Sequence, residues 1–72
     1  MIKPTDVGKR VSVQYYDDDG ARTEAVGTLE RVEIVEGEPV LHIRKRDDSL
    51  VGVPMRRVRF GKVIAPSRRK PW

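Results

Sequence analysis

The sequence predicts an all-β domain built as a small five-stranded barrel, with one 3₁₀ turn before the last strand and a flexible C-terminal tail. Apolar residues alternate with polar ones over most of the chain, which is the period of half-buried strands. Clusters of glycine, proline and aspartate separate these stretches and are typical of turns. A chain of 72 residues is long enough for one domain, and closing its sheet hides the strand edges.

The first expected strand covers residues 10–16, where two valines and a tyrosine alternate with polar side chains. Three aspartates and a glycine follow. Because like charges and glycine do not continue a strand, they predict a solvated turn. The second expected strand covers residues 22–35. Its alternation slips near Gly27, which predicts a bulge or sharp bend that lets one long strand serve two sheets.

The third strand is expected at residues 40–46, where a leucine and an isoleucine face one way and polar side chains face the other. The fourth is short, over residues 50–53, because Pro54 stops it. That proline also suits the start of a 3₁₀ turn, expected at residues 54–57. Residues 58–64 alternate again and form the last expected strand.

Five short strands with this spacing predict an SH3-like barrel, the simplest closed sheet of that size. We expect it to span residues 1–65. Residues 66–72 combine two prolines with three basic residues and predict an extended or disordered tail. The expected core is formed by the inward-facing apolar side chains, namely Val11, Val13, Val26, Leu29, Ile34, Leu41, Ile43, Val51, Val53, Val58 and Phe60.

Charge is divided along the chain. The net charge is +4, but residues 1–40 carry five basic and nine acidic residues, whereas residues 41–72 carry ten basic and two acidic ones. If the fold keeps these halves apart, one face becomes basic enough to attract phosphate. If the fold interleaves them, arginines pair with glutamates across strands and the charges neutralise one another. The sequence leaves both arrangements open.

Composition argues against several classes of function. The chain has no cysteine and so no disulfide or thiolate site. Its single histidine, His42, cannot build a metal site alone, and it is expected at the surface because it lies on the polar face of the third expected strand. No apolar run approaches the roughly 20 residues of a membrane helix. Asp17-Asp18-Asp19 lacks an adjacent base or hydroxyl and predicts a solvated turn or, alternatively, a loose divalent-cation site. We expect no enzyme activity, cofactor, bound metal, small-molecule substrate or membrane partner, and a cytoplasmic location.

Four segments carry a resemblance to a known family: DVGKRV at residues 6–11, AVGTL at residues 25–29, IRKRDDSLVGVP at residues 43–54 and GKVIAP at residues 61–66. They resemble the SH3-like domain at the N-terminus of some actinobacterial GNAT-type acetyltransferases, through the spacing of glycine, valine and proline. The resemblance implies a bacterial, non-catalytic module that positions a partner or flanks a catalytic domain. It carries over no catalytic residue, because the family's transferase domain has no counterpart among these 72 residues.

Residues 53–58 are also similar to the proline-led 3₁₀ turn of eukaryotic SH3 domains, and residues 15–17 are similar to their aromatic start. Polyproline recognition by those domains needs aromatic rails. Arg56 and Arg57 stand where a groove tyrosine would lie, so we do not expect polyproline binding. The strand layout is similar to that of Sm-like proteins as well, but their RNA pocket uses an asparagine and this chain has none.

Two classes of function remain. The preferred one is a protein-interaction or accessory module, with Tyr16 and Trp72 as candidate contact residues, since tryptophan is enriched at interface hot spots. The alternative is a sequence-independent nucleic-acid-binding module. Arginine pairs bidentately with phosphate and stacks on bases, and such binding falls steeply with salt. Its candidate residues are the basic ones of the second half: Arg44, Arg46, Arg56, Arg57, Arg59 and Lys62.

Overall fold

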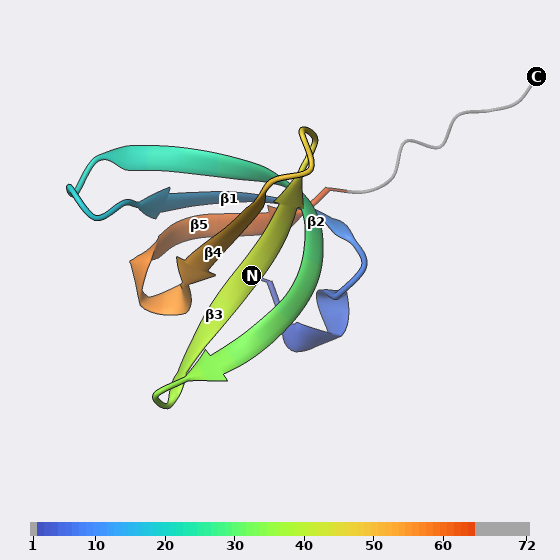
Figure 1. Ribbon diagram of the computed structural model, residues 1–72, viewed down its shortest axis with the longest axis horizontal. Helices are drawn as coiled ribbons and strands as arrows, with labels where there is room; N and C mark the ends of the chain where they lie inside the picture. The colour runs from blue at the N-terminus through green and yellow to red at the C-terminus, as the bar shows by residue number, and fades with distance from the viewer. Residues whose placement is uncertain (1, 65–72) are drawn as a thin grey trace, which may run out of the picture.

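The computed structural model describes residues 2–64, which form one five-stranded antiparallel sheet (Figure 1). The described residues contain no α-helix, so the all-β prediction is confirmed. None of the helical turns in residues 2–64 has the length and apolar character needed to cross a bilayer. In chain order the elements are the 3₁₀ helix η1 (Pro4–Asp6), β1 (Arg10–Tyr16), β2 (Arg22–Val35), β3 (Glu38–Lys45), β4 (Leu50–Pro54), the 3₁₀ helix η2 (Met55–Arg57) and β5 (Val58–Val63).

Hydrogen bonding places the strands in the order β4-β3-β2-β1-β5. β4 and β5 are the two edges, and no pairing joins them within residues 2–64, so the observed hydrogen bonds do not close the sheet. The long β2 pairs with β1 along its first half and with β3 along its second half. Figure 1 shows β2 curving strongly between these halves, so one strand serves both sides of the sheet.

Gly27 lies where β1, β2 and β3 meet. It is buried and pairs with residues of both neighbouring strands. A Cβ atom at this position would overlap the backbone carbonyl of Arg44, so glycine is what allows β3 to approach this closely. The register shift of β2 against β3 falls between Leu29 and Arg31, later than the sequence indicates. The bend and the bulge are therefore neighbouring features and not one feature at Gly27.

The core lies on the inner face of the sheet. Six of the predicted core residues are buried there, and Val51 and Val58 are partly buried and pack against them. Sequence analysis missed Ile2 and Ala25, which are also buried. Ile2 comes from the N-terminal segment and packs over Gly61 of β5. The complete buried core of the described residues is Ile2, Val11, Val13, Ala25, Leu29, Leu41, Ile43 and Val53.

Phe60 was predicted to face the core and instead has an exposed fraction of 53%. The cause is a register shift in the β1–β5 ladder between Gln14 and Tyr15. After this shift Gly61 lies opposite Val13 on the inner face, and its neighbour Phe60 therefore points to the other side, because successive side chains alternate along a strand.

Ile34 and Val26 are the other two predicted core residues that lie elsewhere. β1 covers β2 only as far as Thr28, so the end of β2 pairs with β3 alone in a two-stranded ribbon. Ile34 lies in this ribbon and has an exposed fraction of 64%. Val26 is half-buried and lies opposite Ser12 on the face away from the core, because the inward positions of β2 are those of Ala25 and Gly27.

Asp6 is the one buried charged residue described, with 8% of its surface exposed. Its Oδ2 accepts the backbone N–H of Lys3 at 2.8 Å, and its Oδ1 accepts the ammonium of Lys9 at 3.2 Å. The backbone hydrogen bond from Lys3, assisted by Lys9, outweighs the opposing effect of burial and holds the pKa of Asp6 below its usual value. The charged carboxylate of Asp6 thus holds the N-terminal segment in place.

We expect Asp6→Asn to lower the melting temperature at neutral pH. A carboxyl whose folded pKa is depressed stabilises the fold above its unfolded pKa, and that contribution is lost as the pH falls through the folded value. The difference in melting temperature between the variant and the wild type should therefore shrink on acidification below the ordinary value of 3.8. Thermal unfolding followed by circular dichroism across this pH range measures it. A difference that stays constant at every pH would contradict the proposed role of the charge.

Candidate functional site

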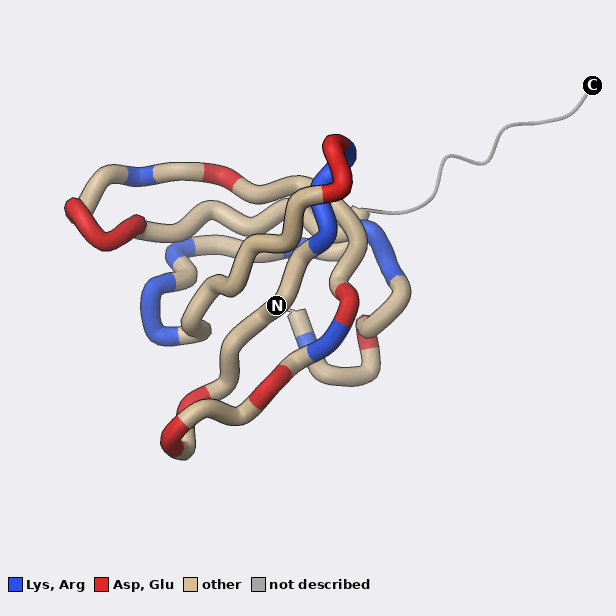
Figure 2. Tube along the Cα trace, viewed as in Figure 1, with Lys and Arg blue, Asp and Glu red and all other residues tan. Residues whose placement is uncertain are grey.

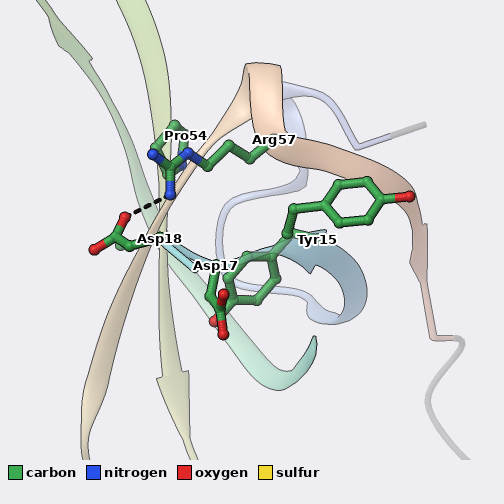
Figure 3. A pocket seen from close by; sticks show the side chains of 7 residues that line it. Tyr15, Asp17, Asp18, Pro54 and Arg57 are labelled. Atoms are coloured by element: carbon green, nitrogen blue, oxygen red, sulfur yellow. Dashed lines mark hydrogen bonds and ion pairs between the residues drawn. The ribbon is translucent and has the colours of Figure 1, made fainter. Parts of the chain in front are cut away.

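A pocket of about 320 Å³ lies between the β1–β2 turn and η2. Figure 3 shows its side chains coming from separate parts of the chain: the end of β1 with the following turn, the end of β4, and η2. These parts meet because Tyr15 of β1 pairs with Val58, the residue directly after η2. The pocket is lined by Tyr15, Tyr16, Asp17, Asp18, Gly52, Pro54 and Arg57.

Asp17 shapes the turn that forms one wall of the pocket. Its Oδ1 accepts the backbone N–H groups of Asp19 at 2.9 Å and Ala21 at 3.0 Å. Its own backbone N–H donates to the carbonyl of Ala21, and its carbonyl accepts from Gly20, which has a positive φ of 82°. The turn is therefore held by an aspartate-centred hydrogen-bond network. Within residues 2–64 no group of three histidine, aspartate or glutamate side chains is arranged to hold a metal ion.

Asp18 joins this turn to η2. Its Oδ1 lies 2.5 Å from Nη1 of Arg57, and the two residues are 39 positions apart in the chain. In Figure 3 the Arg57 side chain extends toward Asp18, and the dashed line marks this ion pair. The Asp18 side chain is 94% exposed and that of Arg57 is 31% exposed. An ion pair so open to solvent contributes at most about 1 kcal/mol, so an incoming charged ligand can displace it.

Apolar surface in the pocket comes from two tyrosines and a proline. Tyr15 packs partly against the core, whereas Tyr16 has an exposed fraction of 41%. Tyr16 is the residue that the sequence nominates for protein interaction, and the structure places it at this pocket. Trp72, the other nominated contact, lies outside the described residues.

The six candidate residues for nucleic-acid binding are not brought together on one face. Arg56 and Arg57 lie in η2, and Arg44 lies near the end of β3. Figure 2 shows these two basic segments well apart, with acidic segments at the turns of the sheet. Arg44 Nε lies 3.4 Å from Glu30, and Arg56 Nη1 lies 2.8 Å from Glu38.

These ion pairs interleave the two halves of the sequence. With the Arg57–Asp18 pair, each joins a cation of residues 41–72 to a carboxylate of residues 1–40. Among residues 2–64, the members of the candidate set without an ion pair are Arg46, Arg59 and Lys62.

His42 also belongs to a pair across strands. Its Nε2 lies 2.8 Å from Oε1 of Glu33, and its side chain is only 15% exposed. Its ring lies beside Gly52, its partner on the neighbouring β4. The histidine expected at the surface is thus largely covered and takes part in strand packing.

Searches against protein-family models, curated proteins and solved structures gave no match. The pocket itself could not be predicted from the sequence, because it depends on the pairing of β1 with β5. Two features of the sequence do indicate parts of the pocket: the aromatic pair Tyr15-Tyr16 before the acidic turn, and Pro54 before the 3₁₀ turn.

Proposed function

We propose that this chain is a non-catalytic, SH3-like barrel module that binds an extended segment of a protein partner or of an adjacent domain. The strand order β4-β3-β2-β1-β5, the curved β2 and the 3₁₀ turn directly before the last strand support this architecture. The observation that carries the function is the pocket in which Tyr16 and Pro54 lie beside the carboxylates of the β1–β2 turn.

The charge of the pocket favours a basic ligand. Its lining contains two carboxylates, Asp17 and Asp18, against the single guanidinium of Arg57. Oδ1 of Asp17 is engaged by the turn backbone, which leaves Asp18 as the carboxylate that a ligand can reach. A lysine or arginine of the partner would replace Arg57 at this position, while an adjacent apolar side chain packs on Tyr16 and Pro54.

The pocket is suited to one apolar anchor and not to a polyproline helix. Paired prolines dock between several aromatic rails. Here Arg57 occupies one side of the pocket, and its guanidinium is held by Asp18. The expected ligand is therefore an extended segment in which one apolar residue neighbours one basic residue.

Selection from a displayed library of random peptides tests this proposal, followed by affinity measurements with the recovered peptides. We expect recovered peptides to combine an apolar and a basic residue, and Tyr16→Ala to weaken their binding by roughly tenfold, as expected for loss of an aromatic contact. Leu50→Ala is the matched control, because Leu50 is also 41% exposed but lies outside the pocket. It should leave the affinity unchanged.

Two results would contradict the proposal. One is a library from which no binding peptide is recovered. The other is a set of peptides that bind Tyr16→Ala as tightly as the wild type. Circular dichroism of both variants establishes that they remain folded.

A further inference from the structure

The face of the sheet away from the core carries an exposed aromatic ring among polar and basic side chains. We call it the outer face, defined by Ser12 and Gln14 of β1, Glu24 and Val26 of β2, and Phe60 and Lys62 of β5. Phe60 lies opposite Gln14, and Lys62 lies opposite Ser12. Phe60 is the most exposed aromatic residue described, at 53%, although it lies within a strand.

The end of this face near the β3–β4 turn is rich in cations. A hollow there is lined by Arg10, Lys45 and Arg46 together with Glu24, Val26 and Asp47. Lys62 lies in the same row of the sheet as Val26, with Ser12 between them. None of these four cations forms an ion pair with another of residues 2–64.

The two acids of the hollow already have hydrogen-bond donors. Oε2 of Glu24 accepts the hydroxyl of Ser12 at 2.8 Å. Oδ1 of Asp47 accepts the hydroxyl of Ser49 at 2.6 Å and its backbone N–H at 3.0 Å. Four cations against two hydrogen-bonded carboxylates leave this end of the outer face positive, which favours a polyanion.

We propose that the outer face binds single-stranded nucleic acid. A base stacks on Phe60, the amide of Gln14 lies beside it for polar contact, and Lys62, Arg46 and Arg10 contact phosphates. Strand spacing of about 4.8 Å places the β5 and β3 positions roughly 14 Å apart, which suits a strand laid across the sheet. Aromatic stacking together with a cationic track is how proteins bind single strands without sequence readout.

A nucleic-acid duplex or an acidic protein would contact fewer of these side chains than a single strand does. Bases inside a duplex are stacked on one another, so they cannot stack on Phe60 without being unpaired. An acidic peptide would use the cations but not the aromatic ring. This site shares no residue with the lining of the pocket at Tyr16, so separate substitutions distinguish its failure from that of the proposed peptide binding.

Fluorescence anisotropy with short, mixed-sequence single-stranded DNA and RNA tests the proposal on the full chain across a series of salt concentrations. Phe60→Leu keeps an apolar side chain but loses the stacking ring, and we expect it to weaken binding by about tenfold at every salt concentration. Phe60→Tyr should bind as the wild type does. Lys62→Gln should lower the magnitude of the salt slope by about 0.7, the value for one phosphate contact on a single strand.

Two control variants lie in the ribbon at the end of β2, away from the outer face. Ile34→Ala removes an exposed apolar side chain, and Arg31→Gln removes a cation whose side chain is 59% exposed. Both should leave affinity and salt slope unchanged. The proposal is overturned if Phe60→Leu binds like the wild type, if the controls weaken binding equally, or if a duplex or polyglutamate binds as tightly as the single strand.

Discussion

Gly27→Ala is expected to destabilise the domain by about 3 kcal/mol, the upper end of the usual cost of overpacking. The new Cβ would overlap the backbone carbonyl of Arg44, and a backbone atom in a strand ladder cannot turn away as a flexible side chain can. Relief requires separating β2 from β3 at the bend of the sheet. The melting temperature should fall by roughly 15 °C in a domain of this size.

Gly52→Ala is the matched control for this substitution. It adds the same methyl group to a glycine of β4, which pairs with the other side of β3. There the new Cβ would lie 3.5 Å from a methyl carbon of Val40 and 3.7 Å from the His42 ring, which are ordinary contact distances. Its melting temperature should change little. Equal losses for the two variants would show that the close approach at Gly27 is not what shapes the sheet.

Ile43→Ala and Ile34→Ala should differ in their effects although both remove the same atoms. Ile43 is fully buried, and its truncation should cost about 3 kcal/mol through lost burial and a residual cavity. Ile34 is 64% exposed, and its truncation should change stability by less than about 0.5 kcal/mol. Urea unfolding of both variants measures the difference. A large loss at Ile34 would mean that the ribbon is covered in solution.

Ile43 and Ile34 also show how far the alternation of apolar and polar residues predicts which side chains are buried. Alternation located all five strands, because each is half-buried and side chains alternate strictly between its faces. It could not tell that β1 begins only at Arg10, opposite Thr28, and therefore does not extend beside Ile34. It also failed at Phe60, because the register shift against β1 leaves Arg59 as an extra residue in β5 and so turns Phe60 outward. Neither the start of β1 nor this register shift can be predicted from the apolar side chains of Ile34 and Phe60 themselves.

For the candidate sites, the sequence likewise predicted single residues but not which residues lie beside them. Tyr16 was nominated from its type alone, and the structure places it beside Pro54 and Asp18 only through the pairing of β1 with β5. The divided charge of the sequence correctly indicated that pairing across strands was an alternative to a single basic face. Which cations remain without ion pairs within residues 2–64 depends on where each glutamate falls in the register. The exposed Phe60 was missed as a binding residue because it was assigned to the core.

The sites proposed for a peptide and for a nucleic acid share no residue. The pocket lies between the β1–β2 turn and η2, while the outer face lies across β2, β1 and β5. Tyr16→Ala should therefore leave the binding of single strands unchanged, and Phe60→Leu should leave the binding of peptides unchanged. One module could hold a protein partner and a nucleic acid together only if the two sites are independent in this way.

A backbone amide NMR titration with a library-selected peptide tests the central claim most directly. We expect shifts confined to residues 15–18 and residues 52–57, which contain the lining of the pocket, and we expect them to disappear in Tyr16→Ala. Shifts concentrated instead on the ribbon at the end of β2, or spread evenly over the sheet, would contradict the assignment of this pocket as the protein-binding site.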